Sequence, residues 1–209
     1  MQRLVEISSG TIEFFLDEPV QSPLGIALVA HPQPLLGGSA EHKIPQLLAK
    51  AVLELGWIAV RPNFRGVGAS SGKHDAGIGE VDDLFDLLQL LCAEFGSLPV
   101  ALIGFSFGAF VQAGVAARMA RAGHDADHVI LAGFPVGNVE GQRNYAPEPL
   151  PAGALLVHGE FDERVPLEAV LQWARQDVHP VTVIPGADHF FKGKLAVLRS
   201  LVVAHMKPR

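Results

Sequence analysis

The sequence predicts an α/β fold in which a mostly parallel, eight-stranded sheet carries helices on both faces. Apolar runs of strand length alternate with longer segments of helical period, as in parallel α/β sheets. Of the 209 residues, 49% are hydrophobic and only 18% are charged, which is enough apolar material for one large core. No internal repeat or low-complexity segment interrupts the alternation. We therefore expect a single domain over residues 1–209.

The expected elements follow one another in a regular order. The first two strands are separated by Ser9-Gly10 and should form an antiparallel hairpin. Strands are expected at 4–8, 11–16, 25–30, 57–62, 100–103, 129–132, 154–157 and 181–184. Helices are expected at 41–55, 80–95, 107–122, 167–175 and 193–205. The segment 138–153, rich in Pro and Gly, is expected to be a loop.

Composition and charge exclude several classes of function. The formal net charge is −6 and there is no basic stripe, which argues against binding nucleic acid. No apolar run is long enough to span a bilayer, and the N-terminus lacks the apolar core of a signal peptide. The single cysteine, Cys92, falls on the apolar side of an expected helix, so we interpret it as a buried, inert thiol. A cytoplasmic location is the default expectation.

Ser106 is the central candidate for catalysis. It lies within Gly104-Phe105-Ser106-Phe107-Gly108, directly after the fifth expected strand and directly before a helix rich in small residues. A serine on such a tight strand-to-helix turn has its hydroxyl lifted out of the sheet, where a base can reach it. The two glycines are needed because a side chain at either position would collide with the neighbouring strand or helix.

A nucleophilic serine needs a base, and the base needs a carboxylate to orient it. The loop after the sixth expected strand has no carboxylate, whereas the loop after the seventh has three. Asp162 lies deep enough in that loop to turn back toward Ser106, while Glu160 and Glu163 are the fallback acids. His189 is the only histidine in the loop after the eighth strand and is the expected base.

The oxyanion formed during attack must be met by fixed hydrogen-bond donors. One candidate is the backbone N–H of Phe107, next to Ser106 and at the start of a helix. The second should come from the loop after the third strand, where prolines on both sides of Gln33 lack an N–H. Gln33 is therefore the expected donor and Leu35 the second choice, while His31 is expected to fix the loop by hydrogen bonding.

Other polar residues favour structural interpretations. Three histidines fall near the ends of strands, but none has the i, i+4 spacing or H-E-x-x-H pattern of a zinc site, so no metal is expected. The glycine-rich loop 63–72 lacks the Gly-Lys-Ser/Thr of a phosphate cradle, and Arg65 is expected to tether it. Leu35, Phe134 and Phe190 are the expected lining of an acyl pocket; core packing explains Phe105 at least as well.

Together these residues resemble the α/β-hydrolase superfamily over essentially the whole chain. More narrowly, they resemble small bacterial serine hydrolases related to dienelactone hydrolases. The matching segments are 31–34, 63–68, 104–108, 158–162 and 186–191. The resemblance implies a triad of Ser106, Asp162 and His189, and hydrolysis of carboxylic esters without a cofactor. Larger members insert a helical lid, whereas segment 138–153 is too short and proline-rich to form one, so no lid domain is expected.

The expected function is acyl-transfer hydrolysis, with a small-molecule ester or thioester as substrate. An open, lidless cleft favours short acyl groups or the protruding end of a larger molecule. Acid should lower the activity, because a protonated His189 cannot act as base. Three alternatives use the same fold: a peptidase or amide hydrolase, a non-catalytic binding protein, and a lyase or cofactor-free haloperoxidase-like enzyme. A homodimer through an edge strand or through the open mouth of the site is one option for self-association.

Overall fold

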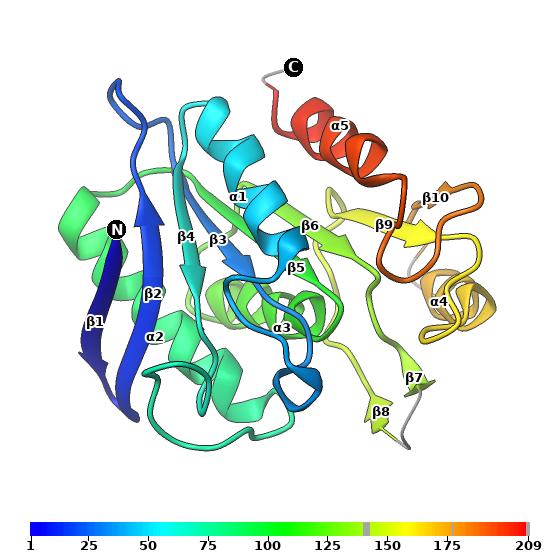
Figure 1. Cartoon of the computed structure of the whole chain (residues 1–209), viewed down its shortest axis with the longest axis horizontal. Helices are drawn as coiled ribbons and strands as arrows, with labels where there is room; N and C mark the ends of the chain where they lie inside the picture. Colours follow the sequence, from blue (N-terminus) through cyan, green and yellow to red (C-terminus); the bar gives the residue numbers. More distant parts are fainter. Residues whose placement is uncertain (140–142, 177, 208–209) are drawn as a thin grey trace.

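The computed structural model describes residues 1–139, 143–176 and 178–207. Among these residues, eight strands form one sheet in the spatial order β1-β2-β4-β3-β5-β6-β9-β10 (Figure 1). Their bounds are β1 (Gln2–Ile7), β2 (Gly10–Asp17), β3 (Ile26–Ala30), β4 (Ile58–Pro62), β5 (Val100–Phe105), β6 (His128–Ala132), β9 (Leu155–Gly159) and β10 (Val181–Ile184). β2 pairs antiparallel with both β1 and β4, and the other neighbours pair in parallel. The predicted eight-stranded, mostly parallel sheet is confirmed.

Helices cover both faces of the sheet, as the sequence predicts. One face packs against α1 (Lys43–Glu54) and α5 (Leu195–Met206). The other face packs against α2 (Ile78–Phe95), α3 (Phe107–Arg121) and α4 (Leu167–Ala174). Strand alternation divides the apolar residues between two cores: along β3, Leu28 belongs to the α2–α3 side, whereas Ala27 and Val29 belong to the α1–α5 side. β3 and β5 are buried along their whole length, as central parallel strands are.

The parallel strands bring distant loops to one edge of the sheet. β3, β5, β6, β9 and β10 run in the same direction, so their carboxyl ends lie together. In register, Ala30 lies opposite Gly104, and Phe105 opposite Ala132. The loops that follow these strands therefore meet at one edge, which is where open α/β sheets bind their ligands.

Segment 138–153 differs from the prediction. It was expected to be a loop, but β7 (Gly137–Val139) and β8 (Arg143–Tyr145) form a small antiparallel sheet of their own. Residues 140–142 of the segment lie outside the described residues. No helix occurs among its described residues, in agreement with the predicted absence of a helical lid. The loop after β3 also contains a short 3₁₀ helix, η1 (Pro34–Leu36).

Two smaller expectations concern the thiol and the membrane. Cys92 is half-buried and packs against the core on the α2–α3 side, and this burial raises the pKa of its thiol. Within the described ranges, no helix has the length and apolar composition that crossing a bilayer requires. A cytoplasmic location stays a prediction.

Candidate active site

Ser106 occupies the turn between β5 and α3 in a strained backbone conformation. Its φ is +54° and its ψ is −123°, a region that residues with a side chain rarely adopt. The flanking glycines allow this turn. A Cβ on Gly104 would lie 2.3 Å from the carbonyl oxygen of Gly108, and a Cβ on Gly108 would lie 2.5 Å from that of Ala30. The predicted steric reason for both glycines is present in the structure.

Three side chains from different loops meet at this turn. The Oγ of Ser106 lies 3.0 Å from Nε2 of His189, and Nδ1 of His189 lies 2.7 Å from Oδ2 of Asp162. Asp162 is fully buried and His189 nearly so, while Ser106 is partly exposed at the cavity. With Nδ1–H donating to the carboxylate, Nε2 is free to accept the hydroxyl proton. The geometry is that of a nucleophile, a base and an orienting acid.

The carboxylate of Asp162 is held at both oxygens. Its Oδ1 accepts hydrogen bonds from the backbone N–H groups of Arg164 (2.9 Å) and Val165 (2.8 Å). Burial alone would raise the pKa of Asp162, but the hydrogen bond and charge of His189, with the Val165 N–H, outweigh burial and lower it. Asp162 therefore stays ionised.

The two fallback acids lie elsewhere. Glu160 accepts a hydrogen bond from the N–H of Gly186 at 2.8 Å, and so links the two loops that carry Asp162 and His189. Glu163 is exposed. Of the three carboxylates in this loop, only Asp162 contacts His189.

His158 is a second buried imidazole beside Asp162. Its Nε2 donates to the carbonyl oxygen of Val165 at 2.9 Å and lies 3.4 Å from Oδ2 of Asp162. Its Nδ1 has no hydrogen-bond partner among the described residues. Burial lowers the pKa of His158, so the ring is neutral. Its hydrogen bond to Val165 holds the loop that carries Asp162 against the end of β9.

The two expected oxyanion-hole donors belong to residues at the site: Phe107 directly follows Ser106, and Gln33 lines the same cavity as Ser106. The N–H of Phe107 is at the first position of α3, where helices leave their amides unpaired. Gln33 precedes η1, and its side chain accepts a hydrogen bond from the N–H of Leu35. Within the described part of the chain, neither the Phe107 nor the Gln33 amide donates to a backbone carbonyl. The N–H of Leu35 is thus used by the turn, which removes the second-choice donor.

His31 fixes the loop that carries Gln33. It is fully buried, its Nδ1 donates to the Pro32 carbonyl at 2.7 Å, and its Nε2 accepts from the N–H of Phe64 at 3.0 Å. Burial lowers its pKa to about 3, so the ring is neutral. The predicted structural role of His31 agrees with these contacts.

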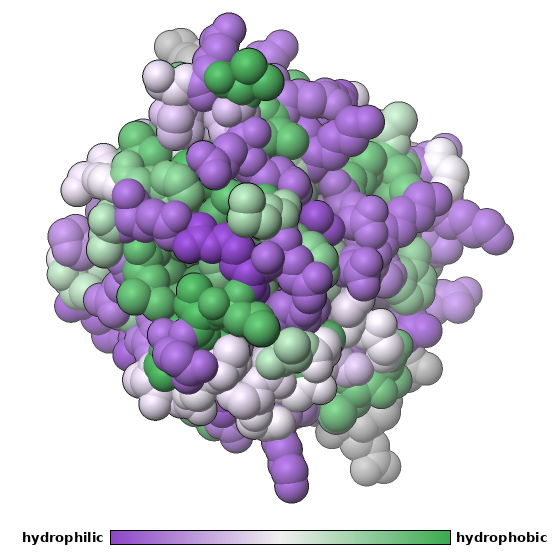
Figure 2. Space-filling model, turned by 60° about the vertical axis from the view of Figure 1, so that its left-hand side comes forward, coloured by the Kyte–Doolittle hydropathy of each residue, from purple (hydrophilic) through white to green (hydrophobic). Residues whose placement is uncertain are grey.

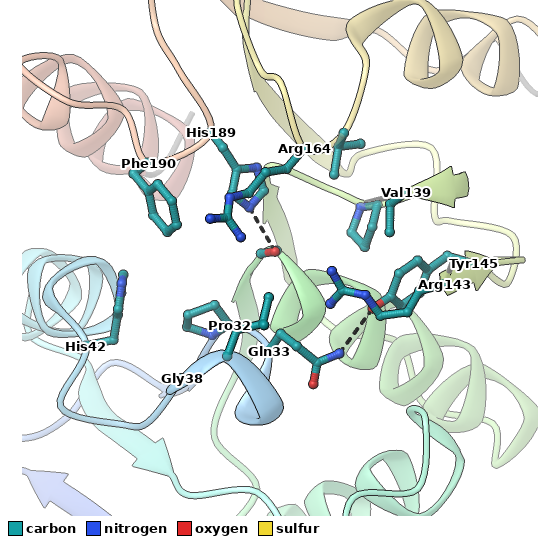
Figure 3. Close-up of a pocket in the computed structure, with 14 residues that line it drawn as sticks. Pro32, Gln33, Gly38, His42, Val139, Arg143, Tyr145, Arg164, His189 and Phe190 are labelled. Atoms are coloured by element: carbon teal, nitrogen blue, oxygen red, sulfur yellow. Dashed lines mark hydrogen bonds between the residues drawn. The ribbon is translucent and has the colours of Figure 1, made fainter. Parts of the chain in front are cut away.

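A cavity of about 310 Å³ opens above Ser106 and His189 (Figure 3). Phe190 lines it, as expected. Leu35 and Phe134 do not, and here the prediction is wrong. Leu35 is 69% exposed, because η1 turns it outward to a different hollow. Phe134 is 1% exposed and packs edge-on against Trp173 in the core.

Sequence reasoning missed several side chains on the cavity wall. His42, Arg143, Tyr145 and Arg164 line it and come from three separate elements (Figure 3). No motif pointed to them: Arg164 lies two residues beyond the matching segment 158–162, and the other three lie in segments without a recognisable pattern. The described residues contain no cluster of three His, Cys, Asp or Glu side chains able to hold a metal ion.

Arg65 has the tethering role that the sequence suggested. Its guanidinium donates to both carboxylate oxygens of Asp83 on α2, at 2.7 and 2.8 Å, and to the carbonyl of Gly79 at 2.9 Å. These contacts hold the glycine-rich loop after β4 against α2.

A mostly parallel sheet with a strained serine between a central strand and a helix defines the α/β-hydrolase fold. A chain from Coxiella burnetii, described as an alpha-beta serine hydrolase homologue, matches with a TM-score of 0.86 and 36% identity, over 99% of this chain and 97% of its own. A serine hydrolase without a lid from Xanthomonas campestris matches with a TM-score of 0.86 and 31% identity, over 98% and 92%.

An uncharacterised protein of Rickettsia prowazekii is 33% identical over 177 residues, which are 81% of this chain and 73% of its own. No protein-family model matches the sequence. The chain belongs to the α/β-hydrolase superfamily, with a lidless serine hydrolase among its similar structures. The narrower link to dienelactone hydrolases stays a prediction.

Proposed function

We propose that the protein is a serine hydrolase that cleaves carboxylic esters or thioesters of small or exposed acyl groups. The observation that carries this proposal is the hydrogen-bonded series from Ser106 through His189 to the ionised Asp162. The amides of Phe107 and Gln33 support it, because among the described residues neither donates to a backbone carbonyl, Phe107 follows Ser106 and Gln33 lines the same cavity. A cavity of about 310 Å³ suits a small acyl group or the end of a larger molecule.

In the acylation step, Oγ of Ser106 attacks the carbonyl carbon while Nε2 of His189 takes the hydroxyl proton. The N–H groups of Phe107 and Gln33 stabilise the negative charge on the former carbonyl oxygen. The tetrahedral intermediate collapses and expels the alcohol or thiol, which takes the proton from His189. Asp162 remains ionised and stabilises the imidazolium.

In the deacylation step, a water molecule attacks the acyl-serine and gives one proton to His189. Collapse of the second tetrahedral intermediate releases the carboxylic acid, and His189 returns the proton to Ser106. No electron transfer or cofactor enters this balance. Amide hydrolysis would use the same steps with a poorer leaving group, so esters and thioesters are the preferred substrates.

A fluorophosphonate probe tests this function. We expect one covalent adduct on the wild-type protein, located on Ser106 by mass spectrometry, and none on Ser106→Ala. Ser200 donates to the Ala196 carbonyl on α5, and Ser200→Ala is the matched control, which should label normally. A panel of p-nitrophenyl esters, acyl-CoA thioesters and p-nitroanilides then ranks the leaving groups. Labelling that persists in Ser106→Ala would contradict the proposal.

A further inference from the structure

Two arginines face the reacting atoms from different elements. Arg164 comes from the loop after β9 and Arg143 from β8, and both line the cavity that holds Ser106 and His189. In Figure 3 their side chains extend into the cavity, Arg164 beside His189 and Arg143 beside Tyr145. None of the reaction steps described above uses either guanidinium.

Arg164 is placed by the same loop that places the acid. Its backbone N–H donates to Oδ1 of Asp162 at 2.9 Å, which fixes the start of the side chain relative to the triad. Its guanidinium carbon lies 5.0 Å from the ring centroid of Phe190, in cation–π contact. This contact holds the cation on the cavity wall.

Arg143 is placed by the small β7–β8 sheet. Residues two apart on a strand share a face, so Arg143 and Tyr145 lie on the same side of β8, and both line the cavity. Tyr145 accepts a hydrogen bond from Nε2 of Gln33 at 3.3 Å, which connects the β7–β8 sheet to the loop after β3. The position of Arg143 is therefore coupled to the position of a residue expected to bind the substrate carbonyl.

The charge of the cavity wall is opposite to that of the chain. The chain carries a formal net charge of −6. In contrast, the 14 described residues that line the cavity include two arginines and no carboxylate. A wall of one sign in a concave site attracts ligands of the other sign.

We propose that the substrate carries a carboxylate or a phosphate close to the scissile carbonyl, bound by Arg143 and Arg164. This proposal rests on the proposed hydrolase function and names its substrate class. Guanidinium groups match the geometry of carboxylate and phosphate oxygens. Both arginines also contact the protein, but a guanidinium has five N–H donors and can hold a substrate anion in addition.

Matched ethyl esters test the anionic acyl group, with acid release followed in a pH-stat. Ethyl butyrate, monoethyl succinate and ethyl 3-phosphonopropionate have similar acyl lengths and differ in the terminal group, which separates carboxylate from phosphate recognition. A second pair, propyl butyrate against O-butyryl glycolate, places the carboxylate in the leaving alcohol. We expect an anionic ester in at least one set to have a kcat/KM about 10- to 100-fold above its neutral partner.

Arg143→Gln and Arg164→Gln should each lower this anionic-to-neutral ratio about 10-fold, and added salt should lower it in the wild type. Arg143→Lys and Arg164→Lys should retain part of the anionic-to-neutral ratio, because lysine keeps the positive charge. Arg175→Gln is the control, because Arg175 is exposed at the end of α4, outside the cavity lining.

Ratios at or below one in every set, with neutral esters still cleaved and Ser106 still labelled, overturn the anion site and leave the hydrolase function standing. A ratio that both glutamine variants leave unchanged also overturns it. Loss of all ester cleavage and of Ser106 labelling would mean instead that the hydrolase function itself is wrong.

Discussion

Asp162 shows how a single residue joins loop structure to chemistry. One carboxylate oxygen shapes its own loop by accepting two backbone N–H groups, and the other orients His189. His158 holds the same loop by donating a hydrogen bond to the carbonyl of Val165. The loop conformation and the ionisation of Asp162 therefore depend on the same few contacts.

Asp162→Asn is the residue-scale prediction for catalysis. The amide keeps the shape of the side chain but favours the wrong tautomer of His189, with the proton on Nε2 facing Ser106. We expect kcat for a p-nitrophenyl ester to fall by about 10⁴-fold, as in other triads, with little change in KM. Glu163→Gln is the matched control, because Glu163 is exposed one position along the same loop. A loss below about 10-fold would argue against the assigned role of Asp162.

Residues at the ends of strands could be predicted from the sequence, but residues on the cavity wall could not. Ser106, Asp162 and His189 each follow a recognisable strand, and the parallel order fixes which edge they share. Arg143 and Arg164 line the cavity because of the path that β8 and the loop after β9 take in space, which the sequence does not indicate. The sequence also could not predict that the side chains of Leu35 and Phe134 point away from the cavity.

At the scale of elements, the sequence predicted the regular strands and helices and missed the smallest pieces. The apolar runs of β3 and β5 and the helical period of α2 are strong signals. β7 and β8 have three residues each, with Asn138 and Asn144 at their centres, and carry no apolar alternation. Their pairing depends on the surrounding fold, so the sequence alone predicts a loop over segment 138–153.

The close approach of α3 to β3 yields a prediction about stability. A Cβ at position 108 would lie 2.5 Å from the carbonyl oxygens of Ala30 and His31, and backbone atoms cannot move aside as a flexible side chain can. We expect Gly108→Ala to lower the free energy of unfolding by about 1–3 kcal/mol, the usual cost of overpacking, measured by urea denaturation. The same shift would displace the amides of Phe107 and Gln33 and lower kcat.

Gly153→Ala is the control for this substitution. A Cβ at position 153 has no heavy atom within 4 Å and its φ is not positive. We expect its unfolding curve to match the wild type within about 0.5 kcal/mol, as for ordinary surface substitutions. Equal stability of both variants would show that the helix has room to move away from the strand.

For the whole molecule, sheet topology is what assembles the site. β4 enters between β2 and β3, so strands far apart in the chain, such as β3 and β5, become neighbours. The alternating pattern of strands and helices predicts a parallel sheet, but it does not specify this spatial order. On the one face that Figure 2 shows, with the side of the β1 edge turned forward, apolar and polar residues are interspersed.

The fold keeps several histidines neutral by full or partial burial, and this makes its stability depend on pH. Burial lowers the pKa of His31 to about 3, and it lowers the pKa values of His42, His128 and His158 as well. In the unfolded chain these histidines titrate near 6.5. At a pH between the folded and the unfolded pKa of each histidine, the unfolded chain binds a proton that the folded chain does not. Acid therefore favours unfolding, and the stabilising contribution is fully present only above about pH 6.5.

His31 alone should reduce the free energy of unfolding by about 2 kcal/mol between pH 7 and pH 5, from a pKa near 6.5 unfolded and about 3 folded. Urea denaturation at the two pH values measures this loss. In His31→Gln the glutamine can still accept from Phe64 and donate to Pro32, but it cannot titrate, so the loss should shrink by about that amount. His124→Gln, at an exposed position, should keep the wild-type loss. An identical pH dependence in all three proteins would mean that His31 is not held neutral by burial, because its proton uptake on unfolding would then be negligible.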